Sequence, residues 1–129
     1  MGYAQATMPF PPADLALLGA TEEIEIETRA APDAPVHRTI IWIMTDGNDA
    51  FVRSVRGGRG RWYREAIANP QVAVHAGGRR LAARVVAAND PTSIERTNKG
   101  LRDKYEGIDG YAEMLEPDCF DTTLRLEPA

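Results

Sequence analysis

The sequence predicts a mainly β fold, an antiparallel β-barrel with flanking helices. Three observations support this prediction. Strand-like segments follow one another along the 129-residue chain, turn signals join neighbouring strands, and one helix-like segment interrupts the run between the third and fourth strands. A meander of this kind favours a closed or partly closed antiparallel barrel over a parallel α/β sheet, and closure hides the edges of a sheet.

The length of the chain fits a single domain. Residues 1–11 combine prolines with small polar residues, so we expect a flexible N-terminal arm followed by one domain over residues 12–129. The domain begins with a short helix over residues 12–18, because Pro12 suits a first helical position and Gly19 can end the helix.

The first two strands form a hairpin. Residues 22–28 alternate strictly, which places Ile24 and Ile26 on one face of a half-buried strand. On the other face lie Glu23, Glu25 and Glu27. We interpret these glutamates as the solvated defence of a sheet edge. A proline-containing loop over residues 30–35 then leads to a second strand over residues 37–45.

The next elements are a strand and a helix. A turn at residues 46–49 leads into a strand over residues 50–56, as in a tight antiparallel connection. After a loop rich in glycine and arginine, residues 61–70 predict a helix of two to three turns. The side chains expected to face inward are Trp62, Tyr63, Ala66 and Ile67.

The last third of the chain completes the barrel. Residues 71–89 predict two strands joined at Gly77 and Gly78, since glycine permits the positive φ angles of a two-residue hairpin. A polar, amphipathic helix follows over residues 91–105, and alternation over residues 121–127 predicts a late strand.

Composition limits the class of protein. Hydrophobic residues make up 43% and charged residues 26%, as in ordinary globular proteins, and the net charge of −4 argues against a surface built for nucleic acid. No segment reaches the roughly 18 apolar residues of a membrane span, and the N-terminus lacks the basic region of a secretory signal. We therefore expect a cytoplasmic protein without a membrane partner.

Several kinds of catalytic site have no support in the sequence. The single cysteine, Cys119, fits a small buried hydrophobe, and His37 and His75 are too few and too isolated for a metal site. His37 is either an exposed strand-end residue or a side chain that faces a ligand at the barrel mouth. No hydrolase elbow, P-loop, Rossmann fingerprint or zinc-protease motif occurs.

The most informative segment is a cluster of arginines without an acidic residue among them. Its members are Arg53, Arg56, Arg59, Arg61 and Arg64. Arginine offers a planar fork of donors that suits phosphate oxygens, Ser54 adds a hydroxyl, and Gly57, Gly58 and Gly60 let backbone N–H groups approach an anion. The loop also runs into a helix N-terminus, which favours negative charge. The alternative is a solvated basic loop that pairs with carboxylates of other elements.

The aromatic pair beside this cluster has two interpretations. Trp62 and Tyr63 could stack on nucleic-acid bases, in which case the arginines would contact phosphates of the backbone. At helical spacing on a short helix that covers a barrel, Trp62 is more often a core residue. We therefore favour the core interpretation and expect no nucleic-acid partner.

Taken together, the segments EIEIETR, HRTIIWIM and VRSVRGGRGRWYREAIANPQVAVHAGGRR resemble the pyridoxamine 5'-phosphate oxidase-like FMN-binding split-barrel superfamily. Within it the chain is most similar to DUF2255-type proteins and deazaflavin-dependent nitroreductases, over residues 22–88. The resemblance implies a six-stranded antiparallel split barrel, a homodimer, and a flavin between subunits or along the barrel wall with its phosphate on the basic loop.

The resemblance also assigns roles to residues of this sequence. Arg53, Ser54 and Arg56 would meet the cofactor phosphate, Gly57, Arg59 and Arg61 would complete the loop, Arg38 and Thr39 would lie beside the flavin ring, and Trp62 and Tyr63 would begin the next helix. The long C-terminal substrate-binding stretch of the pyridoxamine phosphate oxidases has no counterpart, which argues against pyridoxine metabolism. Arginines replace the lysine and proline common in the nitroreductases, so the cofactor is either FMN or the deazaflavin coenzyme F-420.

The function implied is a flavin- or deazaflavin-dependent oxidoreductase, nitroreductase-like, of unknown small-molecule substrate. The cofactor would supply the hydride chemistry, which agrees with the missing motifs. The substrate pocket would involve the N-terminal arm, Trp42 and residues 105–111. Two alternatives stay open: a non-catalytic module that holds a flavin, haem or other anionic ligand, and an interaction domain that uses the arginine loop on an acidic partner.

Overall fold

The computed structural model describes residues 8–129, and residues 1–7 of the predicted arm lie outside the described residues. Its strands are β1 (Ile24–Thr28), β2 (His37–Ile41), β3 (Met44–Asp46), β4 (Asp49–Val52), β5 (Gln71–Ala76), β6 (Arg79–Ala87) and β7 (Leu124–Pro128). Its helices are α1 (Pro12–Ala20), α2 (Arg61–Ala68), α3 (Pro91–Tyr105) and α4 (Tyr111–Met114), with the short 3-10 helices η1 (Gly57–Arg59) and η2 (Pro117–Thr122).

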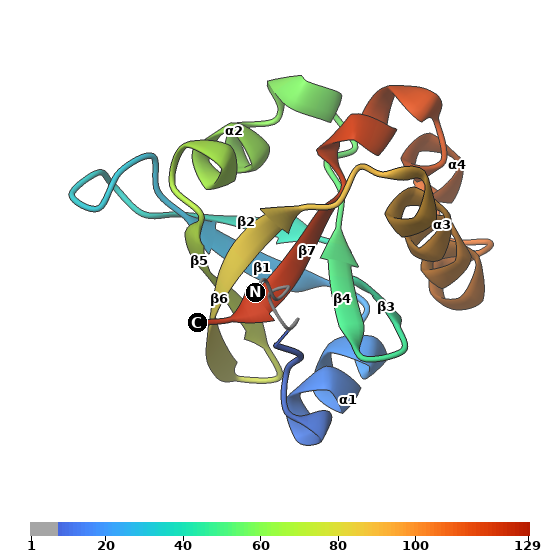
Figure 1. The fold of residues 1–129 in the computed structure, drawn as a ribbon, viewed down its shortest axis with the longest axis horizontal. Coiled ribbons are helices and arrows are strands. Elements are labelled where there is room, and N and C mark those ends of the chain that lie inside the picture. The colour runs from blue at the N-terminus through green and yellow to red at the C-terminus, as the bar shows by residue number, and fades with distance from the viewer. Residues whose placement is uncertain (1–7) are drawn as a thin grey trace, which may run out of the picture.

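The strands form one seven-stranded sheet in the order β2-β1-β5-β6-β7-β4-β3, with every neighbouring pair antiparallel. The sheet curls strongly into a half-barrel, with α1 at one end and α2, α3 and α4 along its sides (Figure 1). The predicted antiparallel sheet with flanking helices is confirmed. The fold is mixed α/β, because the four α-helices contain nearly as many residues as the strands, so the predicted mainly β class and the predicted number of six strands are wrong.

The additional strand arises because the segment predicted as one strand over residues 37–45 divides at Trp42 and Ile43. The backbone of Ile43 is bound by side chains of α3 instead of a neighbouring strand. Its N–H donates to the Tyr105 hydroxyl at 3.2 Å, and its carbonyl accepts from Lys104 Nζ at 2.8 Å. These long-range bonds end one strand, and β3 begins at Met44.

Two other strands are shorter than predicted. β4 ends at Val52 because the next residues turn into the protein interior, where Ser54 N–H donates to Thr122 Oγ1 at 2.9 Å. β7 begins at Leu124, and most of the preceding predicted strand forms η2, in which Thr122 Oγ1 donates to the carbonyl of Cys119. A side-chain-to-backbone bond of this kind competes with strand pairing.

The hairpin and helix predictions agree well with the structure. Gly47, Gly77 and Gly78 have φ angles of 61°, 57° and 78°, as tight hairpins between β3 and β4 and between β5 and β6 require. α3 passes through Gly100 without interruption. A Cβ atom at Gly100 would lie 3.0 Å from Met44 Cβ, so the glycine lets α3 pack closely on β3.

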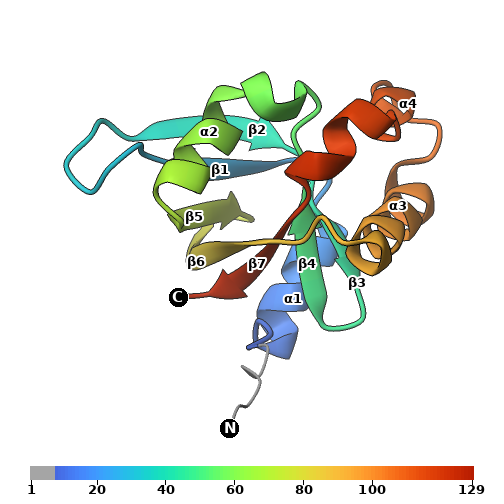
Figure 2. The ribbon, with the colours of Figure 1, turned by 45° about the horizontal axis from the view of Figure 1, so that its top comes forward.

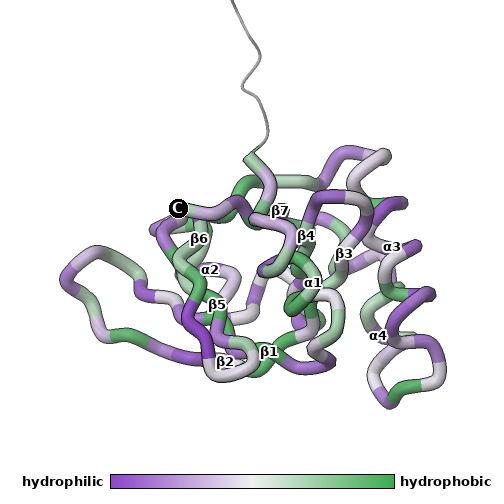
Figure 3. The backbone as a smooth tube through the Cα atoms, turned by 90° about the horizontal axis from the view of Figure 1, so that it is seen from below, coloured by the Kyte–Doolittle hydropathy of each residue, from purple (hydrophilic) through white to green (hydrophobic). Residues whose placement is uncertain are grey.

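The core fills the inside of the half-barrel. Ile24, Ile26, Val52 and Val74 of the sheet are fully or almost fully buried there, and Phe10, near the start of the described residues, is only 4% exposed. A second cluster beneath α3 contains Met44, Leu101, Tyr105 and Met114. Along the chain, hydrophobic and hydrophilic residues alternate in the strands, while α3 is largely hydrophilic (Figure 3).

α2 covers the half-barrel with a narrower face than predicted. Trp62 and Ala66 are buried, one helical turn apart, and Tyr63 packs partly buried against the core. Ile67 is 50% exposed, so its predicted inward orientation is wrong. It lies five positions after Trp62, which turns its side chain away from the face that Trp62 and Ala66 share.

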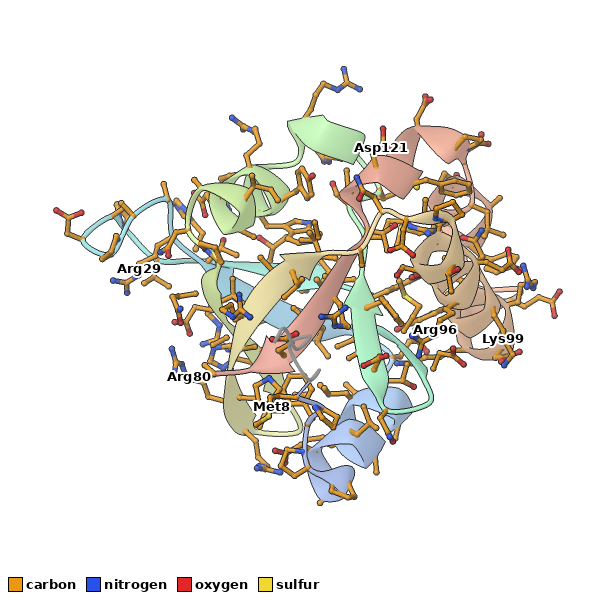
Figure 4. The ribbon with its side chains drawn as sticks, in the orientation of Figure 1. Met8, Arg29, Arg80, Arg96, Lys99 and Asp121 are labelled. Atoms are coloured by element: carbon orange, nitrogen blue, oxygen red, sulfur yellow. The ribbon has the colours of Figure 1, made fainter. Side chains whose placement is uncertain are left out.

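The glutamate stripe belongs to an internal strand. β1 lies between β2 and β5, so the interpretation of these residues as a sheet-edge defence is wrong. Glu25 pairs with Arg38 at 2.6 Å, and Glu27 pairs with Arg80 at 2.9 Å and with His75 at 2.7 Å. Arg80 lies on the side of the sheet opposite α3 (Figure 4). Glu25 and Glu27 therefore cross-link four consecutive strands of the sheet, β2, β1, β5 and β6.

We expect Glu27 to make stability sensitive to acid. Hydrogen bonds from Arg80 and then His75 outweigh the opposing effect of burial and lower the pKa of Glu27 from 4.5 to about 2. Because the folded-state pKa is the lower one, this stabilisation is complete above pH 4.5 and is lost as pH falls towards 2. Urea unfolding should show Glu27→Gln to be about 1 to 2 kcal/mol less stable than wild type at pH 6, with the difference shrinking by pH 3.

The matched control is Glu23→Gln, which removes an exposed carboxylate without an ion pair among the described residues. This variant should lose stability with falling pH as the wild type does. A Glu27→Gln protein whose difference from wild type stays constant between pH 6 and pH 3 would contradict the assignment.

Candidate functional site

α2 lies over β1 and β2 at one side of the half-barrel (Figure 2). A cavity of about 550 Å³ is lined by residues of β2, of the segment from Arg53 to Trp62, and of α4 and the turn before it. It is lined by Thr39, Ile40, Ile41, Trp42, Arg53, Ser54, Val55, Arg56, Gly60, Arg61, Trp62, Gly110 and Met114. β2 is an edge strand, and the pairing register places Thr39 and Ile41 opposite the inward residues of β1 but Ile40 opposite an outward one. The cavity therefore reaches around the free edge of β2.

The lining combines two chemical characters. The segment that follows β4 and opens α2 contributes Arg53, Arg56 and Arg61, and the residues from β2 contribute a largely apolar wall. No lining residue is acidic, and none is a histidine, lysine or cysteine. The cavity thus offers positive charge and apolar surface, but no side chain suited to general acid–base catalysis at neutral pH.

Arg53 is the largest fully buried side chain of the described residues, at 1% exposed. Its Nε donates to Thr123 Oγ1 at 2.9 Å, and Nη1 donates to Asn98 Oδ1 at 2.7 Å and to the Met114 carbonyl at 3.0 Å. All of these acceptors are neutral. Burial lowers the pKa of Arg53 below its ordinary value, but an arginine stays protonated in proteins. The site therefore holds a buried positive charge.

The other arginines of the cluster are exposed and have no carboxylate partner in the described part of the chain. They are Arg56, Arg59, Arg61 and Arg64. Most arginines elsewhere form ion pairs, such as Arg38 with Glu25, and Arg96 with Asp46 at 2.6 Å across the space between α3 and the β3–β4 hairpin (Figure 4). Within residues 8–129 the basic loop is therefore solvated, and the carboxylate pairing that the alternative expected does not form.

The loop before α2 is tightly folded. Ser54 Oγ donates to the Gly57 carbonyl at 2.8 Å, and Gly57 has a φ of 65°. A Cβ atom at Gly60 would lie 2.6 Å from Ser54 Oγ, so this close approach requires a glycine. Gly60 is also the N-cap of α2, which begins at Arg61. A glycine has no side chain that could accept hydrogen bonds from the backbone N–H groups of the first helical turn.

Six of the ten residues proposed from the sequence line this cavity. They are Thr39, Arg53, Ser54, Arg56, Arg61 and Trp62. Gly57, Arg59 and Tyr63 lie next to lining residues in the chain but do not line the cavity themselves. Arg38 lies on the outward side of β2, where it pairs with Glu25, since neighbouring side chains of a strand point to opposite faces.

Trp62 and Cys119, which the sequence predicted to be structural residues, are buried in the structure. Trp62 is 6% exposed and packs in the core, edge-on to Tyr63 with ring centroids 6.2 Å apart, so the core interpretation is confirmed. Cys119 is buried, and burial raises the pKa of its thiol. His37 contacts Glu65 of α2 at 2.8 Å and does not line the cavity.

Sequence reasoning missed several lining residues. Ile40, Ile41 and Val55 belong to apolar or basic segments in which nothing distinguishes a cavity wall from a core face. Met114 comes from α4, far along the chain from the arginine loop, and only the fold brings it to the cavity. Trp42 and Gly110, which fall within the residues expected to form the substrate pocket, do line the cavity. Among residues 8–129, no helix is long and apolar enough to cross a membrane, and no group of acidic, histidine or cysteine side chains could hold a metal.

The fold is shared with several solved structures. The haem storage protein HutZ of Vibrio cholerae is 15% identical, with a TM-score of 0.65, over 95% of this chain and 92% of that chain. A Listeria innocua protein provisionally described as a pyridoxamine 5'-phosphate oxidase is 18% identical, with a TM-score of 0.62, over 90% of each chain. An F-420-dependent reductase is 18% identical, with a TM-score of 0.58, over 81% of this chain and 93% of that chain.

At these identities the similarity shows the fold alone: the curled sheet is that of the split-barrel proteins related to the pyridoxamine phosphate oxidases. Comparison with curated proteins finds no match. A family profile described as "Uncharacterized protein conserved in bacteria (DUF2255)" matches residues 14–126. Since this match covers nearly all of the chain, the protein belongs to the DUF2255 family.

Proposed function

We propose that this protein is an oxidoreductase that binds a flavin-type cofactor, FMN or the deazaflavin coenzyme F-420, in the cavity beside β2. The observation that carries the proposal is the charge of that cavity, whose three lining arginines face no acidic lining residue. An anion with several acceptor oxygens, such as a phosphate, is the ligand that such a set of donors recognises.

The residues present fit a cofactor of this kind. A volume of about 550 Å³ lies in the range of small-molecule and cofactor sites, roughly 300 to 1,000 Å³. Arg56 and Arg61 are exposed and form no ion pair within residues 8–129, so they can bind a phosphate, while the buried Arg53 adds a fixed charge behind them. The apolar residues from β2 provide the wall that a flat, poorly hydrated ring requires.

A flavin or deazaflavin, when bound, supplies hydride transfer, so the protein needs few acids or bases of its own. The role of the protein is then to bind the phosphate and to orient the ring along Thr39 and its neighbours. Ile41, Trp42 and Met114 would exclude water from the ring. The F-420-dependent reductase of the same fold, and the Listeria innocua protein provisionally described as a pyridoxamine 5'-phosphate oxidase, support this assignment. They leave the substrate unnamed.

The proposal includes a homodimer. Ile40 and Val55 line the cavity and are 60% and 54% exposed, an apolar surface at the rim that a second copy would cover. The cofactor-bound protein should therefore have the mass of a dimer by light scattering.

The test is a titration of the purified protein with FMN and, in parallel, with F-420, followed by absorbance and fluorescence. We expect saturable binding of one of them, and either reduction of the bound cofactor by hydride transfer from a reduced nicotinamide cofactor or reoxidation of the reduced cofactor by an acceptor such as a nitroaromatic compound. Binding without any turnover would show a non-catalytic module, a role that the haem storage protein of the same fold makes plausible. Binding of neither cofactor would refute the proposal.

A further inference from the structure

Trp42 occupies an unusual position at the cavity. It lies in the two-residue break between β2 and β3, so its backbone belongs to neither strand. Its side chain is partly exposed and lines the cavity, whereas Ile43, the next residue, is fully buried. The break that divides the predicted strand thus places the indole of Trp42 in the cavity wall.

One face of this indole is covered by a fixed partner. The rings of Trp42 and Tyr105 stack with centroids 4.1 Å apart and an interplanar angle of 3°. Tyr105 is fully buried, and its hydroxyl contacts the backbone of Glu22 and of Ile43. Lys104 Nζ lies 5.1 Å from the Tyr105 ring centroid and also binds the Ile43 carbonyl. The buried Tyr105 ring therefore fixes the orientation of the Trp42 ring by packing against one of its two faces.

The edge of the indole is held by the turn between α3 and α4. Gly110 has a φ of 97°, and a Cβ atom there would lie 3.6 Å from Trp42 Cη2. This backbone conformation favours glycine, and it brings the turn against the indole edge. Gly110 itself lines the cavity, so the turn does not close the cavity off from Trp42. An aromatic ring that is held on one face and at one edge is a preorganised stacking surface.

From this geometry we propose that Trp42 is the stacking platform for the conjugated ring of the ligand, while Arg56 and Arg61 bind its phosphate. The inference rests on the proposed function and names the residue that recognises the ring. Residues 39–42 supply the ring contact and residues 53–61 the anion contacts, so the ligand class is an elongated molecule with a flat aromatic system and an anionic tail. Stacking is sensitive to the flat ring and indifferent to the phosphate.

The experiment compares FMN with riboflavin, which carries the same ring without the phosphate. Trp42→Leu should weaken the binding of both ligands by about tenfold, which is about 1.4 kcal/mol, because both would lose the stacking of the same ring on an aromatic side chain. A tenfold loss for both ligands supports the platform. An unchanged affinity for both would overturn it.

A second pair of variants keeps the test valid if Trp42→Leu fails to fold. An indole in van der Waals contact with a flavin quenches flavin fluorescence by electron transfer, and phenylalanine, a much poorer electron donor, does not. Both tryptophans of the chain line the cavity, so Trp42→Phe and Trp62→Phe can be compared directly. We expect bound FMN to be dark in wild type, to recover its emission at least fivefold in Trp42→Phe, and to stay dark in Trp62→Phe.

Recovery of emission in Trp62→Phe alone would place the ring on the other tryptophan and overturn the inference while FMN binding, and with it the proposed function, stands. Wild-type protein that binds neither FMN nor F-420 would instead refute the proposed function, and the inference would fall with it. With F-420 as the bound cofactor, the same two phenylalanine variants and the same emission measurement apply.

Discussion

The double substitution Arg56→Ala and Arg61→Ala is expected to lower the affinity for FMN by a factor of at least 100. Both side chains line the cavity, and neither forms an ion pair within residues 8–129. Each hydrogen bond from a charged group contributes about 1.5 to 3 kcal/mol, so two lost contacts remove about 3 to 6 kcal/mol of binding free energy. Titration of the variant with FMN, followed by fluorescence, measures the loss.

The chain offers a control with the same change in net charge. Arg59 and Arg64 are exposed and unpaired within the described chain, like Arg56 and Arg61, but they do not line the cavity. Their double alanine variant should lose only long-range attraction, a few-fold effect that vanishes at high salt. Riboflavin should bind the Arg56/Arg61 variant as well as it binds wild type. Equal losses of FMN affinity in the two double variants would mean that the cluster acts only through its overall charge.

Arg53→Met is expected to lower the free energy of unfolding by about 3 kcal/mol. Methionine retains the apolar stem but none of the donors, so Asn98 Oδ1, the Met114 carbonyl and Thr123 Oγ1 each lose a hydrogen bond inside the protein. Relief from burying a guanidinium offsets part of this loss. Urea unfolding should show a lower midpoint with an unchanged slope.

Arg56→Met provides the comparison, since it makes the same chemical change at an exposed position. Surface substitutions of this kind usually change stability by no more than about 0.5 kcal/mol. Arg53→Lys should also be destabilised, because an ammonium cannot reach acceptors on three separate elements as a planar fork does. If Arg53→Met and Arg56→Met unfolded at the same urea concentration, the buried hydrogen bonds of Arg53 would contribute nothing to folding.

Much of the fold could be predicted from local signals. The hairpin at Gly77 and Gly78 has positive φ angles that glycine adopts best, and α3 opens with Pro91 in its first turn behind the N-cap Asp90, so both are specified by residues close together in the sequence. The division of the strand at Trp42 could not be predicted in this way. It depends on Tyr105 and Lys104 binding the backbone of Ile43 from about sixty residues further along the chain.

The candidate site divides similarly. The arginines and Ser54 are close in sequence, so their charge and spacing predict an anion-binding loop, and Arg53, Ser54, Arg56 and Arg61 do line one cavity. The sequence did not reveal that Arg53 and Arg56 differ in kind, one buried against neutral acceptors and the other exposed and free. Alternation along a short strand predicts which face of the sheet each side chain lies on. Whether a residue just after the strand, such as Arg53, is buried depends on which helix packs against it, in this case α3.

The absence of titratable side chains from the cavity lining, apart from arginines, determines how binding responds to pH. Apart from arginines, the lining residues are apolar residues, tryptophan, serine, threonine and glycine. With FMN as the ligand, the second ionisation of its phosphate monoester, near pH 6, is then the titration that occurs in contact with these lining residues. A change of FMN affinity across neutral pH would therefore reflect the ionisation of the ligand and not that of the residues lining the cavity.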